Sequence, residues 1–307
     1  MCKNQKKRQK ILPCVILAVL FVISPSLIHS HYSQPALKNE VDLEKILKKC
    51  AEYCEKLAYS SLYFVCNEKV KEEIFGSPPV YVVGGRTTST VIGGRTYSTA
   101  VVGRLTRKNV CVYDYQLIRK NFEINEKRML IEENGKKKSE KDARLKTRIF
   151  SHSNLIFGPV GLLSEFWQEY YNYTIIKRDK FKKNKVIIIE ATPIPYMKTS
   201  NLYGKIWVRE DDFSIVKIEW EQESIKNYEL IEEFAKKLNA KPELEFLAEY
   251  AFEKNGIRFP SKCSITERYL RQRGGSYTRS KTTITYKDYK FFTVETEVKY
   301  DKKLAPK

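Results

Sequence analysis

Alternation of apolar and polar residues dominates the chain from about residue 109 onward. Residues 213–221 show the pattern well, because charged residues separate Val216, Ile218 and Trp220. Side chains of a β-strand point to its two faces in turn, so this spacing predicts a strand with one packed face and one wet face. We therefore expect a β-sheet that is covered on one side.

Predicted strands of this kind follow one another with short turns. Asn134-Gly135 and Asn255-Gly256 lie between apolar runs, and Asn-Gly is a strong hairpin signal. About ten strands in succession predict an α+β fold that is mainly antiparallel β, in which the large sheet must curl or pack against helices. The charged connection at residues 136–148 is interpreted as a solvated loop. The predicted strands are residues 58–75, 110–117, 129–132, 173–178, 186–191, 202–209, 213–221, 243–253, 257–270, 278–289 and 292–300.

Helical spacing of apolar residues predicts helices at two places in this pattern. Residues 41–57 are predicted to form an amphipathic helix against the sheet, after an unstructured tail at residues 31–40. Ser224 is predicted to cap a short helix that Asn239 and Pro242 end. These helices are candidates to cover the packed face of the sheet.

Residues 158–171 are also predicted to form a helix, since Pro159 is favoured at a first helical position. The helix has a broad apolar and aromatic face. It can be ordinary core that plugs a curved sheet, or a lid over an apolar cavity. Both need the same residues, so both interpretations stay open.

The N-terminus has the order of a secretory signal: basic residues, then an apolar run, then small and polar residues. We expect residues 1–30 to be a cleaved signal peptide, with an uncleaved inner-membrane anchor as the alternative, because residues 11–28 are just long enough to span a bilayer. Export places the remaining chain in the periplasm. The domain is expected over residues 41–300, followed by a tail at residues 301–307.

A nine-residue unit is repeated almost perfectly at residues 82–90 and 91–99. Its Gly-Gly-Arg-Thr core supplies turn residues, and the β-branched residues around it suit short strands. We interpret residues 80–104 as a surface loop expanded by duplication. A binding loop that presents arginines is the alternative.

The chain is strongly basic, with 56 Lys and Arg residues against 37 Asp and Glu residues. Removal of residues 1–30 takes away five basic residues and no acidic one, which leaves a net charge of +14. This charge favours anionic partners such as lipid headgroups or a membrane surface, although it can also serve solubility alone. Export argues against nucleic acid.

Catalytic and metal-binding patterns are missing from the sequence. There is no G-x-S-x-G, H-E-x-x-H or phosphate-loop motif, and His152 is the only histidine within the predicted folded region. Five cysteines remain after residue 30, so at least one is free, and the spacing of Cys50 and Cys54 fits a helical core stripe better than a metal site. We expect no enzyme activity, no cofactor and no metal.

Three stretches carry a resemblance to a known family: GKIWVR at residues 204–209, FSIVKI at residues 213–218 and YKDYKFFTV at residues 286–294. With the leading helix and the interposed aromatic helix, the layout resembles the LolA/LolB-type lipoprotein carriers and is similar to the RseB/MucB sensors. The resemblance implies a curved half-barrel sheet that holds acyl chains and is closed by helices.

We therefore expect a monomeric periplasmic protein that binds lipid or lipoprotein acyl chains. An apolar ligand needs a concave lining with few polar anchors. The alternative is a non-catalytic envelope sensor or scaffold that binds a protein partner. The residues predicted to line the cavity or its lid are Leu163, Phe166, Trp167, Tyr170, Trp207 and Trp220.

Overall fold

The computed structural model describes residues 35–60, 62–76, 91–92, 95–96, 105–120, 123–150, 153–195, 202–226, 228–272 and 275–292. The predicted signal peptide, most of the glycine-rich repeat, His152 and residues 293–307 lie outside this part of the chain. Within the repeat, β2 (Val91–Ile92) and β3 (Arg95–Thr96) pair with each other as short strands.

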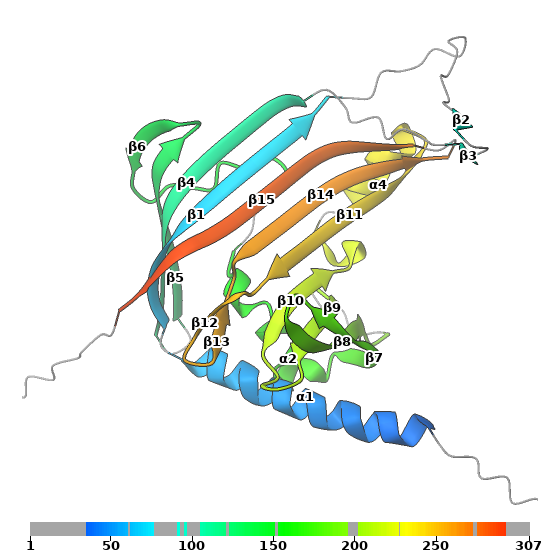
Figure 1. Cartoon of the computed structure of the whole chain (residues 1–307). Helices are drawn as coiled ribbons and strands as arrows, with labels where there is room; N and C mark the ends of the chain where they lie inside the picture. Colours follow the sequence, from blue (N-terminus) through cyan, green and yellow to red (C-terminus); the bar gives the residue numbers. More distant parts are fainter. Residues whose placement is uncertain are drawn as a thin grey trace, which may run out of the picture.

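One antiparallel sheet of eleven strands forms the body of the molecule, in the order β6-β5-β4-β1-β15-β14-β11-β10-β9-β8-β7. The sheet curves strongly without closing, so that β6 and β7 are its two edges (Figure 1). The predicted fold class is confirmed. The strands are β1 (Leu62–Phe75), β4 (Leu105–Lys120), β5 (Glu123–Glu133), β6 (Lys136–Glu140), β7 (Tyr171–Phe181), β8 (Asn184–Pro193), β9 (Gly204–Arg209), β10 (Ile215–Trp220), β11 (Ala240–Glu249), β14 (Lys262–Arg271) and β15 (Ser276–Phe291).

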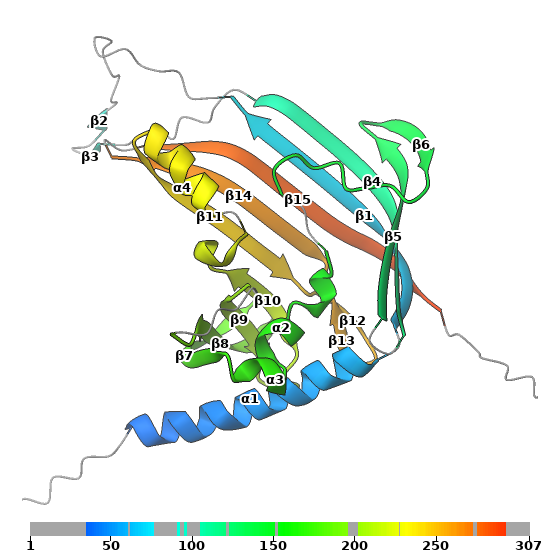
Figure 2. The same ribbon diagram turned by 180° about the vertical axis from the view of Figure 1, so that it is seen from behind.

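The alternating pattern places one face of each central strand in the core. Along β1, every second residue from Leu62 to Glu72 is buried, and the residues between them are more exposed. The same face packs against α1 (Pro35–Tyr59), which crosses the hollow side of the sheet (Figure 2). The inner, concave face therefore holds the core of the molecule.

The helices differ from the predictions at their ends. α1 begins at Pro35, so the predicted unstructured tail is wrong for residues 35–40, and it continues to Tyr59, which had been assigned to a strand. Proline is tolerated in the first turn of a helix, which is consistent with this start. α4 (Tyr228–Lys237) confirms the short helix, and Asn239 follows it with a positive φ of 47°. Ser224 does not cap this helix, because it ends the separate 3-10 turn η2 (Gln222–Ser224).

Both Asn-Gly hairpins are confirmed. Asn134 and Gly135 join β5 to β6 with positive φ angles, as this turn chemistry requires. Strand β6 also corrects the predicted solvated loop, because residues 136–140 pair with β5. Around Asn255-Gly256 the predicted long strands are broken, and β12 (Phe252–Lys254) and β13 (Ile257–Phe259) form a separate small hairpin near α1 (Figure 1).

Gly204 is required where β9 passes β10. It lies opposite Trp220 with a φ of +153°, and an added Cβ would overlap Glu219 O and lie 2.9 Å from Trp220 Cα. Both neighbours are backbone atoms of β10, so neither can move aside without disturbing the strand pair.

We predict that Gly204→Ala lowers the free energy of unfolding by about 3 kcal/mol or more, because steric overlap adds to backbone strain. The control is Gly135→Ala at a hairpin turn with a φ of +82° and no atom within 4 Å of the added Cβ, where only the backbone term of about 1 kcal/mol applies. Urea unfolding measures both. Equal losses in the two variants would contradict the steric account.

Candidate functional site

A short irregular segment fills the hollow of the sheet. We call residues 153–170 the plug; it contains the 3-10 turn η1 (Leu155–Phe157), α2 (Val160–Leu163) and α3 (Glu165–Gln168). Its buried residues are Leu155, Ile156, Pro159, Leu162 and Leu163. The plug lies between α1 and the concave face (Figure 2).

The plug corrects the prediction of a single helix over residues 158–171. Ser164 has an extended backbone, with a ψ of 151°, and separates α2 from α3. Its carbonyl accepts hydrogen bonds from the backbone N–H groups of Trp167 and Gln168, which is how an N-cap residue starts a new helix. Ser164 makes no side-chain capping hydrogen bond, and its extended backbone divides the apolar run into two single turns.

Side chains from the surrounding elements hold the plug. Its backbone carbonyls accept hydrogen bonds from hydroxyl and thiol groups, and Gln168 Nε2 donates to Leu47 O of α1 at 2.9 Å. The backbone N–H of Asn154 donates to Glu126 Oε1 at 2.8 Å. The side-chain donors to the plug are Tyr250 Oη to Leu155 O at 2.8 Å, Cys54 Sγ to Pro159 O at 3.4 Å, and Tyr173 Oη to Leu162 O.

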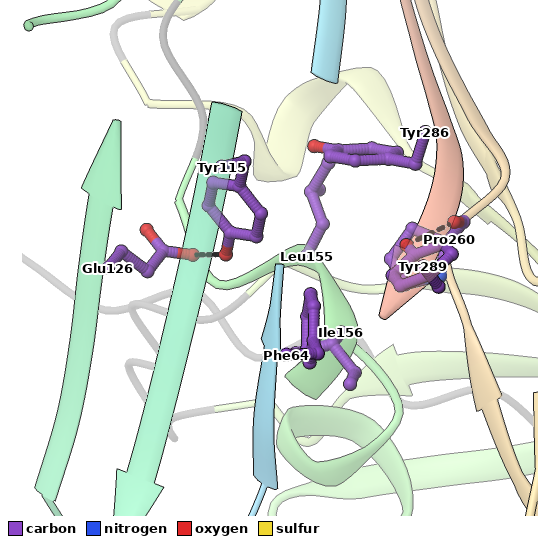
Figure 3. Close-up of a pocket in the computed structure, with 8 residues that line it drawn as sticks. All are labelled: Phe64, Tyr115, Glu126, Leu155, Ile156, Pro260, Tyr286 and Tyr289. Atoms are coloured by element: carbon purple, nitrogen blue, oxygen red, sulfur yellow. Dashed lines mark hydrogen bonds between the residues drawn. The ribbon is translucent and has the colours of Figure 1, made fainter. Parts of the chain in front are cut away.

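A narrow pocket lies beneath η1 (Figure 3). Leu155 and Ile156 of the plug form one side, and aromatic side chains of the sheet form the other. The pocket has about 250 Å³ of space between its atoms. Only a small part of this space is wide enough for a solvent molecule, and that part has room for about one water. An acyl chain does not fit while the plug is in place. The other lining residues are Phe64, Tyr115, Glu126, Pro260, Tyr286 and Tyr289.

Aromatic rings continue from this pocket toward the β12–β13 hairpin. Phe64 makes an edge contact with Phe259 at 5.4 Å between ring centres and lies 5.2 Å from Tyr289. Phe252 stacks on Tyr289 at 4.9 Å. Displacement of Leu155 and Ile156 would therefore open the pocket onto an aromatic surface of the sheet.

The concave face also carries a buried charge pair beside the pocket. Arg128 Nε donates to Glu68 Oε2 at 2.6 Å, and Tyr286 Oη donates to Glu68 Oε1 at 2.9 Å. Burial acts to lower the pKa of Arg128, but its hydrogen bonds and charge interaction with Glu68 raise it above the ordinary value. The guanidinium also lies over the Tyr115 ring at 4.8 Å, and burial and Glu126 raise the pKa of Tyr115 well above its usual range. Arg128 is therefore held in its charged form by Glu68.

Two buried oxygen atoms on neighbouring strands of this face lack a hydrogen-bond partner among the described residues. Glu72 of β1 lies opposite Thr282 of β15, and both are buried. Glu72 Oε1 accepts the backbone N–H groups of Arg148 and Ile149, at 2.9 and 3.2 Å. Glu72 Oε2 and Thr282 Oγ1 have no hydrogen-bond partner among the described residues. This pair could hold the polar part of a ligand or an ordered water.

The structure brings five of the six predicted lining residues to the plug or its surroundings. Leu163 is buried, and Phe166, Trp167 and Tyr170 form an aromatic trio with ring centres 5.1 to 5.6 Å apart. Phe166 is 61% exposed. Trp220 is buried against Phe246, with 4.3 Å between ring centres, and lies next to Gly158 of the plug. Their part in ligand binding stays a prediction.

Trp207 is separated from the other five. Ile206 and Val208 point into the main core, so Trp207 between them lies on the opposite face of β9. There it packs with Val186, Ile188 and Val216, and Lys217 Nζ lies 4.0 Å from its ring centre. In the sequence, the apolar residues Ile206 and Val208 on either side of Trp207 already indicated that Trp207 lies on the opposite face of the strand.

The five cysteines of the described residues are free and buried. Burial raises the pKa of Cys50 to about 12 and that of Cys54 well above its ordinary value, so neither is an activated nucleophile. In the part of the chain that the structure describes, no group of three or more His, Cys, Asp or Glu residues is arranged to hold a metal ion. No helix in the same residues is long and apolar enough to cross a membrane.

Several solved structures match the chain over most of its length. A LolA superfamily protein from Nitrosomonas europaea is 12% identical, with 81% of this chain and 94% of that chain covered and a TM-score of 0.35. A putative outer membrane lipoprotein-sorting protein domain from Vibrio parahaemolyticus is 11% identical, with 83% and 95% covered and a TM-score of 0.39. The resemblance predicted from the sequence is confirmed as a likeness of fold.

MucB of Pseudomonas aeruginosa, in its complex with MucA, is a more distant match. It is 8% identical, with 80% of this chain and 93% of that chain covered and a TM-score of 0.20. No family model and no curated protein matches the chain. At these identities the likenesses concern the fold alone, so no residue role is transferred.

We predict that Arg128→Met lowers the free energy of unfolding by about 3 to 5 kcal/mol, because Glu68 stays buried without its guanidinium partner. Adding Glu68→Gln should recover about 2 kcal/mol or more by removing the buried charge. The control Lys49→Met breaks an exposed pair with Glu52 and should change stability by less than about 1 kcal/mol. Urea unfolding of the four proteins tests this; equal effects of Arg128→Met and Lys49→Met would contradict it.

Proposed function

We propose that this protein binds an acyl chain of a lipid or lipoprotein on its concave face, in the bacterial envelope, after removal of residues 1–30. The proposal includes no catalytic step. The supporting observation is the plug, which covers an apolar and aromatic surface with two single helical turns instead of a long helix. The plug is the part of this cover that can leave most easily.

The plug has few ties that resist its displacement. The backbone hydrogen bonds of residues 155–168 are local to the segment. The links of the plug to α1 and the sheet are single side-chain donors, the Asn154 N–H bond to Glu126 and one backbone bond from Ile194 N–H to Tyr170 O. Segments with few fixed backbone pairings belong to the low-stability end of a fold. The plug can therefore move while the sheet keeps its pairing.

The free energies of plug release and acyl binding are of similar size. Exposing Leu155, Ile156, Leu162 and Leu163 costs about 1.5 to 3 kcal/mol for each side chain. A buried CH₂ group contributes about 0.8 kcal/mol, so a chain of roughly 8 to 15 CH₂ groups offsets the loss. Acyl chains of ordinary membrane lipids can thus replace the plug, while short fatty acids cannot.

The aromatic trio gives the acyl chain a first contact. Phe166 has most of its ring in solvent beside Trp167 and Tyr170, at the end of the plug that adjoins β7. An exposed aromatic cluster of this kind is a typical recognition surface for apolar ligands. A chain bound there would compete with the contacts that hold α3.

We predict that Phe166→Ser weakens binding of a fluorescent long-chain fatty acid about tenfold, the loss expected from one aromatic contact. Because Phe166 is mostly exposed, the melting temperature should not fall. Leu230→Ser is the control, since Leu230 is 58% exposed on the distant helix α4. Equal binding by the wild type and both variants would show that the aromatic trio is not part of the binding site.

Mass spectrometry of organic extracts tests the function itself. Residues 31–307 should be purified from a bacterial periplasm without detergent and compared with a mock preparation. A stoichiometric co-purified lipid is the expected result and names the ligand class. A folded, lipid-free protein that also fails to take up fatty acid would contradict acyl binding and favour the alternative of a protein-binding sensor or scaffold.

A further inference from the structure

A basic hairpin lies at the β7 edge of the sheet. We define it as residues 177–185, the end of β7, the turn and the start of β8, with six basic residues and one acidic residue (Figure 2). Lys180, Lys183 and Lys185 are exposed and have no acidic partner within 4.0 Å among the described residues. Their charge is therefore available to a partner.

Two local features of the basic hairpin are energetically unfavourable. Lys180 and Lys185 lie directly opposite each other in the strand register, and like charges in such a pair are destabilising. Lys182 in the turn has a φ of 56°, a conformation in which glycine or asparagine is preferred. Violations of local rules of this kind are expected at functional sites.

The hairpin at the other edge of the sheet shows the contrast. Between β5 and β6, Glu132 lies opposite Lys137 and Glu133 lies opposite Lys136. The turn is the favoured Asn134-Gly135. There opposite charges face each other across the strand register, so protection of a sheet edge does not by itself require lysine opposite lysine.

Aromatic rings lie next to the basic hairpin on the outer face. Phe181 and Trp207 pack on the same small apolar cluster of Val186, Ile188 and Val216. Lys182 Nζ lies 5.2 Å from the Phe181 ring centre, and Lys217 Nζ lies 4.0 Å from that of Trp207. Lysines beside aromatic rings are typical of surfaces that meet the headgroup region of a bilayer.

We propose that the basic hairpin binds the surface of a bilayer that contains anionic phospholipids, with Lys180, Lys183 and Lys185 against the phosphate groups. Unpaired lysine at an exposed tip gains attraction from several headgroups at once, and the gain falls off within a Debye length. Bilayer binding at this hairpin does not depend on acyl binding at the concave face, so either can fail without the other.

Vesicle sedimentation tests the basic hairpin. Residues 31–307 should bind vesicles of phosphatidylethanolamine and phosphatidylglycerol, bind phosphatidylcholine vesicles weakly, and lose binding as salt is added. The triple variant Lys180→Gln, Lys183→Gln, Lys185→Gln should bind the anionic vesicles about a hundredfold more weakly. The matched control is Lys136→Gln, Lys137→Gln, Lys138→Gln in β6, which removes the same charge from the other edge and should keep wild-type binding.

Three results would overturn this assignment. The wild type could fail to bind anionic vesicles. Both triple variants could lose affinity equally, which would make net charge the cause. The hairpin variant could aggregate while its soluble fraction binds as the wild type does, which would leave the lysines with a protective role at the sheet edge only.

Discussion

A broad antiparallel sheet with one apolar face must cover that face, and the rest of this molecule follows from that requirement. Eleven strands are too many to stay flat, so the sheet curves and its apolar residues line a hollow. The helix α1 crosses the hollow and fills only part of it. The plug supplies the remaining cover, and because it consists of single turns it is tied mainly by side-chain donors. The segment that completes the cover is thus also the one that we propose to move.

Polar groups on the concave face set limits to what the hollow can accept. Glu68 and Arg128 are paired in full, so they give the sheet a fixed internal structure and offer little to a ligand. Glu72 Oε2 and Thr282 Oγ1, on adjacent strands, have no hydrogen-bond partner in the part of the chain that the structure describes. An apolar ligand with one polar group fits this division better than a wholly polar one, since buried polar atoms need partners.

Local sequence signals predicted the sheet and its turns. The alternation in β10 and the Asn-Gly turns at Asn134 and Asn255 act over a few residues, so the fold class could be inferred from the sequence. The break at Ser164 could not, because an apolar run hides a capping residue that only tertiary contacts select. Trp207 lies on the outer face of β9 with Lys205 and Arg209, so its prediction as a lining residue rested on its aromatic ring and not on its place in the alternation. The Glu68–Arg128 pair joins strands that are distant in sequence.

Displacement of the plug is the central claim, and a covalent lock on the plug tests it most directly. Cys54 Sγ lies 3.4 Å from Pro159 O, which makes Pro159→Cys a candidate to form a disulfide with Cys54. Uptake of a fluorescent fatty acid would be measured before and after reduction, with the disulfide to Cys54 verified by peptide mass. The oxidised protein should take up no fatty acid, and reduction should restore uptake. Equal uptake by the oxidised and reduced forms would contradict displacement of the plug.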